Sequence, residues 1–142
     1  MLRRDLATVI RRHRPEVLIS IDYRERWSSA FNQADHRAVG VALVDAARDA
    51  ANRWIFPGAG GAPWDGVRFA LFGGSSEATH AVDVTDTIDA GVASLREHRA
   101  YLEALGGGTI GTDPDSFLRE MAHAVGPSIG VAAAVSFELV SL

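Results

Sequence analysis

The sequence predicts an α/β fold in which helices pack against a mainly parallel β-sheet. Segments with helical spacing alternate along the chain with short apolar runs rich in Val, Ile and Phe, an order typical of layered α/β proteins. The length of 142 residues predicts a single domain, residues 1–142. An apolar fraction of 47% and a charged fraction of 23% are those of an ordinary globular protein.

The first half of the chain predicts a helix, a strand and a second helix. Apolar residues at helical spacing mark the first helix, which Pro15 ends: Leu2, Leu6, Val9 and Ile10. The run VLISID, residues 17–22, predicts a buried strand, and the polar stretch after it predicts a loop. The second helix is marked by Val39, Leu43, Ala46 and Ala50, with Asp35 at a natural N-cap position.

The second half predicts three more strands and two more helices. The stretch PGAGGAPWDG, residues 57–66, is a loop by composition, and 106–114 is another. Strands are expected at 67–72, 79–84 and 131–140, and helices at 85–105 and 115–125. In open α/β sheets, ligands bind beyond the carboxyl ends of the strands, so the loop after residue 22 is a candidate site.

Composition excludes several classes of site. Cys is absent, which excludes disulfides, thiol catalysis and cysteine-ligated zinc, so any metal site must use His, Asp and Glu. All 14 basic residues are Arg, and the net charge of -4 gives no general attraction to nucleic acid. The sequence has no apolar run long enough to cross a bilayer and no signal-peptide pattern at its start, so we expect a cytoplasmic protein without a membrane partner.

The pair Asp35-His36 has two interpretations. It is either a polar start to a helix, with Asp35 as N-cap and His36 exposed, or half of a metal site with His36 as the ligand. Spacing alone favours the cap. His98 falls on an apolar helical stripe and His80 alternates with Val82 and Val84, so both are interpreted as structural.

Other features carry weaker signals. The cluster of basic residues near the start is interpreted as a solvated helix face: Arg3, Arg4, Arg11, Arg12 and Arg14. The glycine-rich stretches match neither a P-loop nor a dinucleotide-binding pattern.

Three segments in order resemble the PIG-L/LmbE family of zinc-dependent N-deacetylases: RRHRPEVLISID, QADHRAVGVALVDAARDAANRWIFP and THAVDVTDTIDAGVASLREHRAYL. The resemblance covers most of residues 5–105, and the tail from 113 also resembles the family's last helix and strand. It implies a Rossmann-like three-layer fold. It also implies hydrolysis of the acetamide of N-acetylglucosamine-like conjugates, with Zn2+ polarising the amide and activating water.

The resemblance assigns a role to each residue of the motif. His36 matches the third zinc ligand of the family's H-P-D-H motif, and Asp35 matches the Asp before it, which supports the neighbouring catalytic group. Gln33 stands where the motif has its first His, which faces the oxyanion. A Gln can donate a hydrogen bond there, but it cannot carry a positive charge or transfer a proton.

The family's main metal motif, A-H-P-D-D-E, is absent from the 142 residues. We therefore expect the chain to correspond to the carboxy-terminal part of such a deacetylase, with the amino-terminal strands missing and with no activity by itself. The alternative is a non-catalytic interaction module that kept the fold and lost the metal. Uncovered apolar faces of the sheet would favour a homo-oligomer or a complementing amino-terminal chain.

Overall fold

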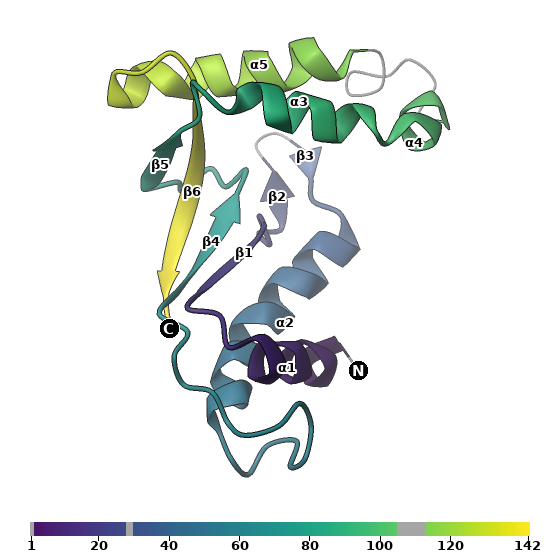
Figure 1. Cartoon of the computed structure of the whole chain (residues 1–142), viewed down its shortest axis with the longest axis vertical. Coiled ribbons are helices and arrows are strands. Elements are labelled where there is room, and N and C mark those ends of the chain that lie inside the picture. Colours follow the sequence, from purple (N-terminus) through teal and green to yellow (C-terminus); the bar gives the residue numbers. More distant parts are fainter. Residues whose placement is uncertain (1, 28–29, 105–112) are drawn as a thin grey trace. The chain divides into compact units, whose positions relative to one another are not determined.

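The computed structural model describes residues 2–27, 30–104 and 113–142, which form two compact units (Figure 1). Unit 1 comprises residues 1–80 and 137–142, and unit 2 comprises residues 81–136. In chain order the elements are α1 (Leu2–His13), β1 (Val17–Ile21), β2 (Arg26–Trp27), β3 (Ala30–Phe31), α2 (Ala34–Ala51), β4 (Phe69–Gly73), β5 (His80–Asp83), α3 (Ile88–Arg96), α4 (Arg99–Ala104), α5 (Pro114–Val125), the 3-10 helix η1 (Gly126–Ile129) and β6 (Ala134–Ser141). The single domain expected from the chain length stays a prediction.

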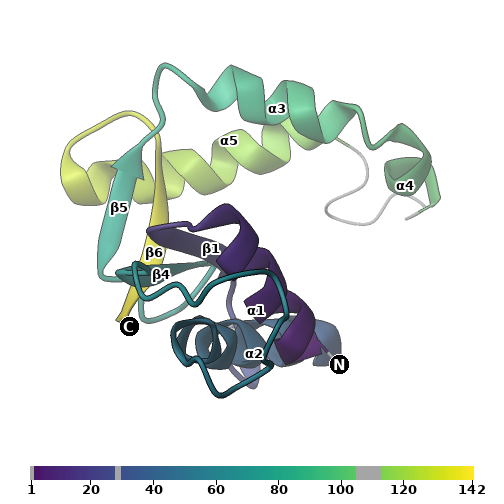
Figure 2. The ribbon, with the colours of Figure 1, turned by 60° about the horizontal axis from the view of Figure 1, so that its bottom comes forward.

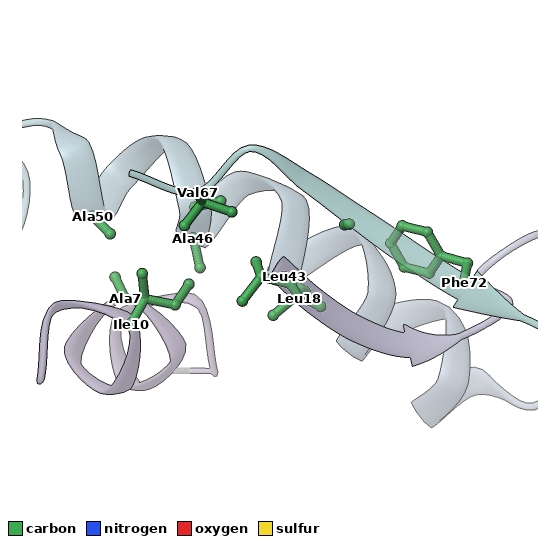
Figure 3. Packing of buried hydrophobic residues seen from close by; sticks show 10 residues of the cluster. Ala7, Ile10, Leu18, Leu43, Ala46, Ala50, Val67 and Phe72 are labelled. Atoms are coloured by element: carbon green, nitrogen blue, oxygen red, sulfur yellow. The ribbon is translucent and has the colours of Figure 1, made fainter. Parts of the chain in front are cut away.

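In unit 1, helices α1 and α2 lie side by side against one face of the sheet (Figure 2). Buried alanines on both helices let the backbones approach closely, and Ile10 and Leu43 fill the space towards the strands (Figure 3). The sheet contributes alternate residues to this core, namely Leu18, Ala70 and Phe72. The period of two along each strand explains why their neighbours, such as Ile19, face the other way.

The predicted mainly parallel sheet is not confirmed. The strand order is β1-β4-β6-β5, and β1 pairs with β4 in parallel, whereas β4 pairs with β6 in antiparallel register. Backbone bonds from Thr79 to Phe137 and from Val84 to Ala133 show that β5 and β6 also run antiparallel. The reason is the returning strand β6, which pairs along part of its length with β4 and along the rest with β5.

Unit 2 packs α3 against α5. Asp113 is the N-cap of α5, since its carboxylate accepts from the N–H of Asp115, and Pro114 follows within the first turn. Arg119 on α5 pairs with Asp115 one turn earlier and with Asp89 on α3. These two hydrogen-bonded carboxylates raise the pKa of Arg119 above its ordinary value.

The single helix predicted at 85–105 is wrong, because the structure breaks it at Glu97 and His98 into α3 and α4. His98 is exposed rather than buried, and its Nδ1 lies 3.1 Å from the carbonyl oxygen of Ser94. His80 is exposed as well. Neither histidine therefore packs into a core. Residue 105 and most of the predicted loop at 106–114 lie outside the described residues.

In the part of the chain that the structure describes, no helix is both long enough and apolar enough to span a bilayer.

Candidate functional site

The candidate site begins where β1 ends. The N–H of Asp22 donates to the carbonyl of Gly73 at 2.9 Å, so the loop leaves the sheet where the carboxyl ends of the parallel strands β1 and β4 lie together. The loop contains the short hairpin of β2 and β3, which the sequence did not predict, and then enters α2 (Figure 1). This is the position that the sequence predicts for a site.

Asn32 holds this loop closed. It is only 3% exposed, and its Nδ2 donates to the carbonyl oxygens of Asp22 at 2.8 Å and Arg24 at 3.0 Å. Its backbone N–H also donates to the carbonyl of Glu25 at 2.9 Å. A buried polar side chain needs such partners, because an unpaired one costs about 1–3 kcal/mol. Sequence reasoning missed Asn32, although its position four residues before His36 is a signal that could have found it.

The oxygen of Asn32 faces the start of α2. Its Oδ1 accepts from the N–H of Gln33 at 2.8 Å and lies 3.1 Å from Nδ1 of His36. His36 is half-buried in the first turn of α2, and the ring of Trp27 contacts it edge-on, with ring centroids 6.1 Å apart. The structure therefore brings His36 together with Asn32 and Trp27.

The predicted N-cap role of Asp35 is wrong. The N-cap of α2 is Gln33, and Asp35 is an exposed residue within the first turn. The helix begins earlier because the backbone of Gln33 is extended while that of Ala34 is already helical. Within the described part of the chain, the Gln33 side chain makes no capping hydrogen bond. Asp35 still lies where a negative charge suits the helix dipole.

A second polar cluster lies in the same loop around Arg24. Its guanidinium donates to Glu138 of β6 at 2.6 Å and to Glu77 at 2.9 Å, and Ser75 donates its hydroxyl to the other oxygen of Glu138 at 2.7 Å. Burial works to lower the pKa of Arg24, but the hydrogen bond to Glu138 and the nearby carboxylate charges outweigh it, so the pKa is raised. The cluster fixes the cationic guanidinium of Arg24 within the loop that leads to His36.

Three buried polar atoms in this region lack a hydrogen-bond partner among the described residues: Asp22 Oδ2, Arg24 Nε and Arg37 Nε. Buried polar atoms in native proteins are normally paired. Because all three lie near the start of α2, this region contains polar groups that the described residues do not supply with hydrogen-bond partners.

Among residues 2–27, 30–104 and 113–142, no three or more His, Asp or Glu side chains are grouped so that they could hold a metal ion. A catalytic zinc takes about three protein ligands. A histidine imidazole is a common zinc ligand, and the described residues do not complete a zinc site around His36.

Comparisons with known proteins find similarity to solved structures. No family model and no curated protein matches the chain. Among solved structures, N,N'-diacetylchitobiose deacetylase from Pyrococcus horikoshii, in complex with its inhibitor MPG, matches with a TM-score of 0.74 and 21% identity, over 98% of this chain and 51% of its own. The conserved protein TT1542 from Thermus thermophilus matches with a TM-score of 0.75 and 25% identity, over 99% of this chain and 57% of its own.

A third structure carries a different activity on a related fold. GalB, the 4-carboxy-2-hydroxymuconate hydratase from Pseudomonas putida, matches with a TM-score of 0.60 and 17% identity, over 99% of this chain and 58% of its own. The first two similarities support an LmbE-like, deacetylase-like fold. The chain spans about half the length of the solved structures that it matches.

Proposed function

We propose that this chain supplies one metal ligand, His36, to a PIG-L/LmbE-type N-deacetylase acting on N-acetylglucosamine-like conjugates. The observation that carries the proposal is the position of His36 at the carboxyl ends of two parallel strands, held by the buried Asn32, in a fold like that of a chitobiose deacetylase. When bound in a complete site, zinc would polarise the acetamide carbonyl and activate a water. The remaining ligands come from another polypeptide segment.

The other residues of the motif take roles beside the metal. Gln33, exposed at the N-cap, can donate its amide N–H to the developing oxyanion, although more weakly than a charged group would. Asp35 contributes negative charge in the first turn of α2, near His36. Residues 2–27, 30–104 and 113–142 place no further imidazole or carboxylate with them as a group of ligands. We therefore expect no deacetylase activity from the 142 residues alone.

An uncovered sheet edge supports the requirement for a second segment. In the described sheet β1 is an edge strand, and on the side away from the core Ile19 is 69% exposed and Val17 37%. The free backbone groups along the edge of β1 can pair with another strand, and its exposed apolar side chains can pack against a further layer. A further segment of an α/β protein, or a second copy of this chain, would cover it.

Acetate release from N,N'-diacetylchitobiose with added zinc tests the function. The 142-residue chain alone is expected to give none, and the chain co-expressed with a segment that contains an A-H-P-D-D-E motif from the same genomic locus is expected to give turnover. His36→Ala should abolish that turnover, whereas His123→Ala, a change at an exposed histidine of α5, should leave it intact. Robust turnover by the isolated chain, or by the His36→Ala complex, would overturn the proposal.

A second candidate is a non-catalytic interaction module on the same fold. It is favoured by Gln33 at the place of the motif's first histidine, and by the fold similarity to a hydratase, since one fold serves several chemistries. The DNA immediately upstream of the Met1 codon distinguishes the two candidates. An in-frame segment encoding A-H-P-D-D-E supports the enzyme, and a stop codon without such a segment at the locus supports the module.

A further inference from the structure

The orientation of the Asn32 side-chain amide is fixed by its neighbours. Its Nδ2 faces two carbonyl oxygens, of Asp22 and Arg24, and its Oδ1 faces the N–H of Gln33. The reverse orientation would place an oxygen against two carbonyl oxygens and an NH2 group against an N–H. Only one orientation satisfies all three neighbours.

This orientation decides which nitrogen of His36 carries the proton. Asn32 Oδ1 has no hydrogen to give, so at 3.1 Å from His36 Nδ1 it can only accept. Nδ1 of a neutral imidazole at this position therefore carries the proton, and Nε2 keeps its lone pair. The edge contact with Trp27 adds a steric restraint on the ring.

We propose that Asn32 is a positioning residue that holds His36 as the Nδ1–H tautomer and so presents Nε2 as the free electron-pair donor. A ring N–H hydrogen-bonded to an oxygen acceptor is how proteins orient histidines that bind metals through the other nitrogen. The purpose of the free Nε2 rests on the proposed function, but the tautomer itself does not. The deacetylase motif does not assign this role to Asn32.

The residue type suits both tasks at once. An asparagine supplies NH2 donors to close the loop and an oxygen to accept from His36. An aspartate would keep the acceptor but turn an oxygen towards the carbonyls of Asp22 and Arg24. An alanine would lose both. The two substitutions therefore separate the tautomer from the closure of the loop.

The experiment is 15N NMR of the histidine side chains of the full 142-residue chain, without metal, at a pH of about 8.5, where a free imidazole is neutral. His36 is expected to show a protonated Nδ1 and an unprotonated Nε2, whereas the exposed His123 should show the mixture of tautomers of a free imidazole. A protonated Nε2 at His36 in the unsubstituted chain would overturn the proposal, whatever the variants do.

The variants distinguish positioning from a merely structural role. Asn32→Asp should keep Nδ1 of His36 protonated while lowering the midpoint of urea unfolding, and Asn32→Ala should shift His36 towards the mixed tautomers. Asn52→Ala, at the other end of α2, is the matched control and should leave His36 unchanged. A fixed Nδ1–H tautomer in Asn32→Ala would also overturn the proposal. The NMR measurement needs no metal. A negative result in the acetate-release assay and a negative result for the His36 tautomer can therefore be told apart.

Discussion

The two ends of α2 are built in opposite ways. At the C-terminal end, Arg11 of α1 is 3% exposed, and its guanidinium nitrogens lie 2.8–3.2 Å from six backbone carbonyl oxygens. A guanidinium has five N–H groups, so one of them is shared between two acceptors. The six carbonyls belong to Asp49, Ala50, Asn52, Ile55, Phe56 and Ala59. The last carbonyls of a helix have no partners within the helix, and here Arg11 donates to two of them, those of Asp49 and Ala50, and to four carbonyls of the residues that follow. The interpretation of Arg11 as part of a solvated basic face is therefore wrong.

At the N-terminal end, the polar groups are only partly matched. The cap residue Gln33 has no side-chain bond to the helix within the described residues, and three unpartnered buried polar atoms lie close by. At the C-terminal end one buried oxygen, Asp49 Oδ2, also has no hydrogen bond among the described residues, but it lies 2.6 Å from Arg3 Nε in an ion pair. The comparison indicates that one end of the helix is built for stability. The other accepts a cost in stability around His36, as is common where polar groups serve a function.

The largest expected effect is the loss of the Arg11 cap. Arg11→Met should lower the free energy of unfolding by about 2–6 kcal/mol, because the part-buried carbonyls of Ile55 and Ala59 lose their donor among the described residues at about 1–3 kcal/mol each. The other four carbonyls keep a backbone N–H donor and lose only a second one. Urea unfolding followed by circular dichroism measures it. Arg12→Met, an adjacent exposed arginine, is the matched control and should change stability by no more than about 0.5 kcal/mol. Equal stability of the two variants would remove the contrast between the helix ends.

The local patterns of the sequence predicted β1, α2 and the place of the candidate site, because period and loop position depend on neighbouring residues. Arg11 could not be predicted, since its six acceptors are backbone carbonyls, which leave no mark in the sequence. Asn32 was missed because two of its partners, Asp22 and Arg24, are also carbonyls. Its spacing to His36 was the one visible signal.

The predicted mainly parallel sheet is not confirmed for a different reason, which is the antiparallel strand β6. β6 pairs with strands some 50–70 residues earlier, and nothing local fixes the direction of such a pairing. The roles of Gln33, Asp35 and His36 stay predictions.

A middle-sized effect is expected at Gly40, where the site loop packs on α2. A Cβ there would lie 2.3 Å from Cβ of Tyr23, whose ring packs on Phe72, so Gly40→Ala should cost about 1–3 kcal/mol through overpacking. Gly91→Ala in α3 is the matched control, since its nearest neighbour would be 3.9 Å away. The control should be neutral or stabilising by up to about 1 kcal/mol. Thermal unfolding compares the two variants. Equal melting temperatures would show that the loop at Tyr23 moves to make room for the added methyl group without loss of stability.

The smallest effect should be a gain, at the cap that α2 lacks. The Gln33 backbone is extended, with φ -61° and ψ 144°, which suits an N-cap. Gln33→Ser should therefore raise the free energy of unfolding by about 0.5–1 kcal/mol, because the hydroxyl can accept from a first-turn N–H. Asp113 of α5 shows such a cap already formed, and it provides a contrast in pH dependence.

The Ser116 hydroxyl and then the Asp115 N–H lower the pKa of Asp113 below its ordinary value. A carboxylate whose pKa is lowered by folding stabilises above its unfolded pKa, about 3.9, and that stabilisation is lost as the pH falls through the lower folded value. A serine hydroxyl does not titrate there. The increase in the free energy of unfolding caused by Gln33→Ser should therefore be the same at about pH 7 and at about pH 3. The decrease caused by Asp113→Ala should be smaller at about pH 3 than at about pH 7. Urea unfolding at the two pH values measures both changes. No gain from Gln33→Ser at either pH would mean that the first N–H groups of α2 already have hydrogen-bond partners. The difference between the two ends of α2 would then depend only on the unpartnered buried polar atoms near its start.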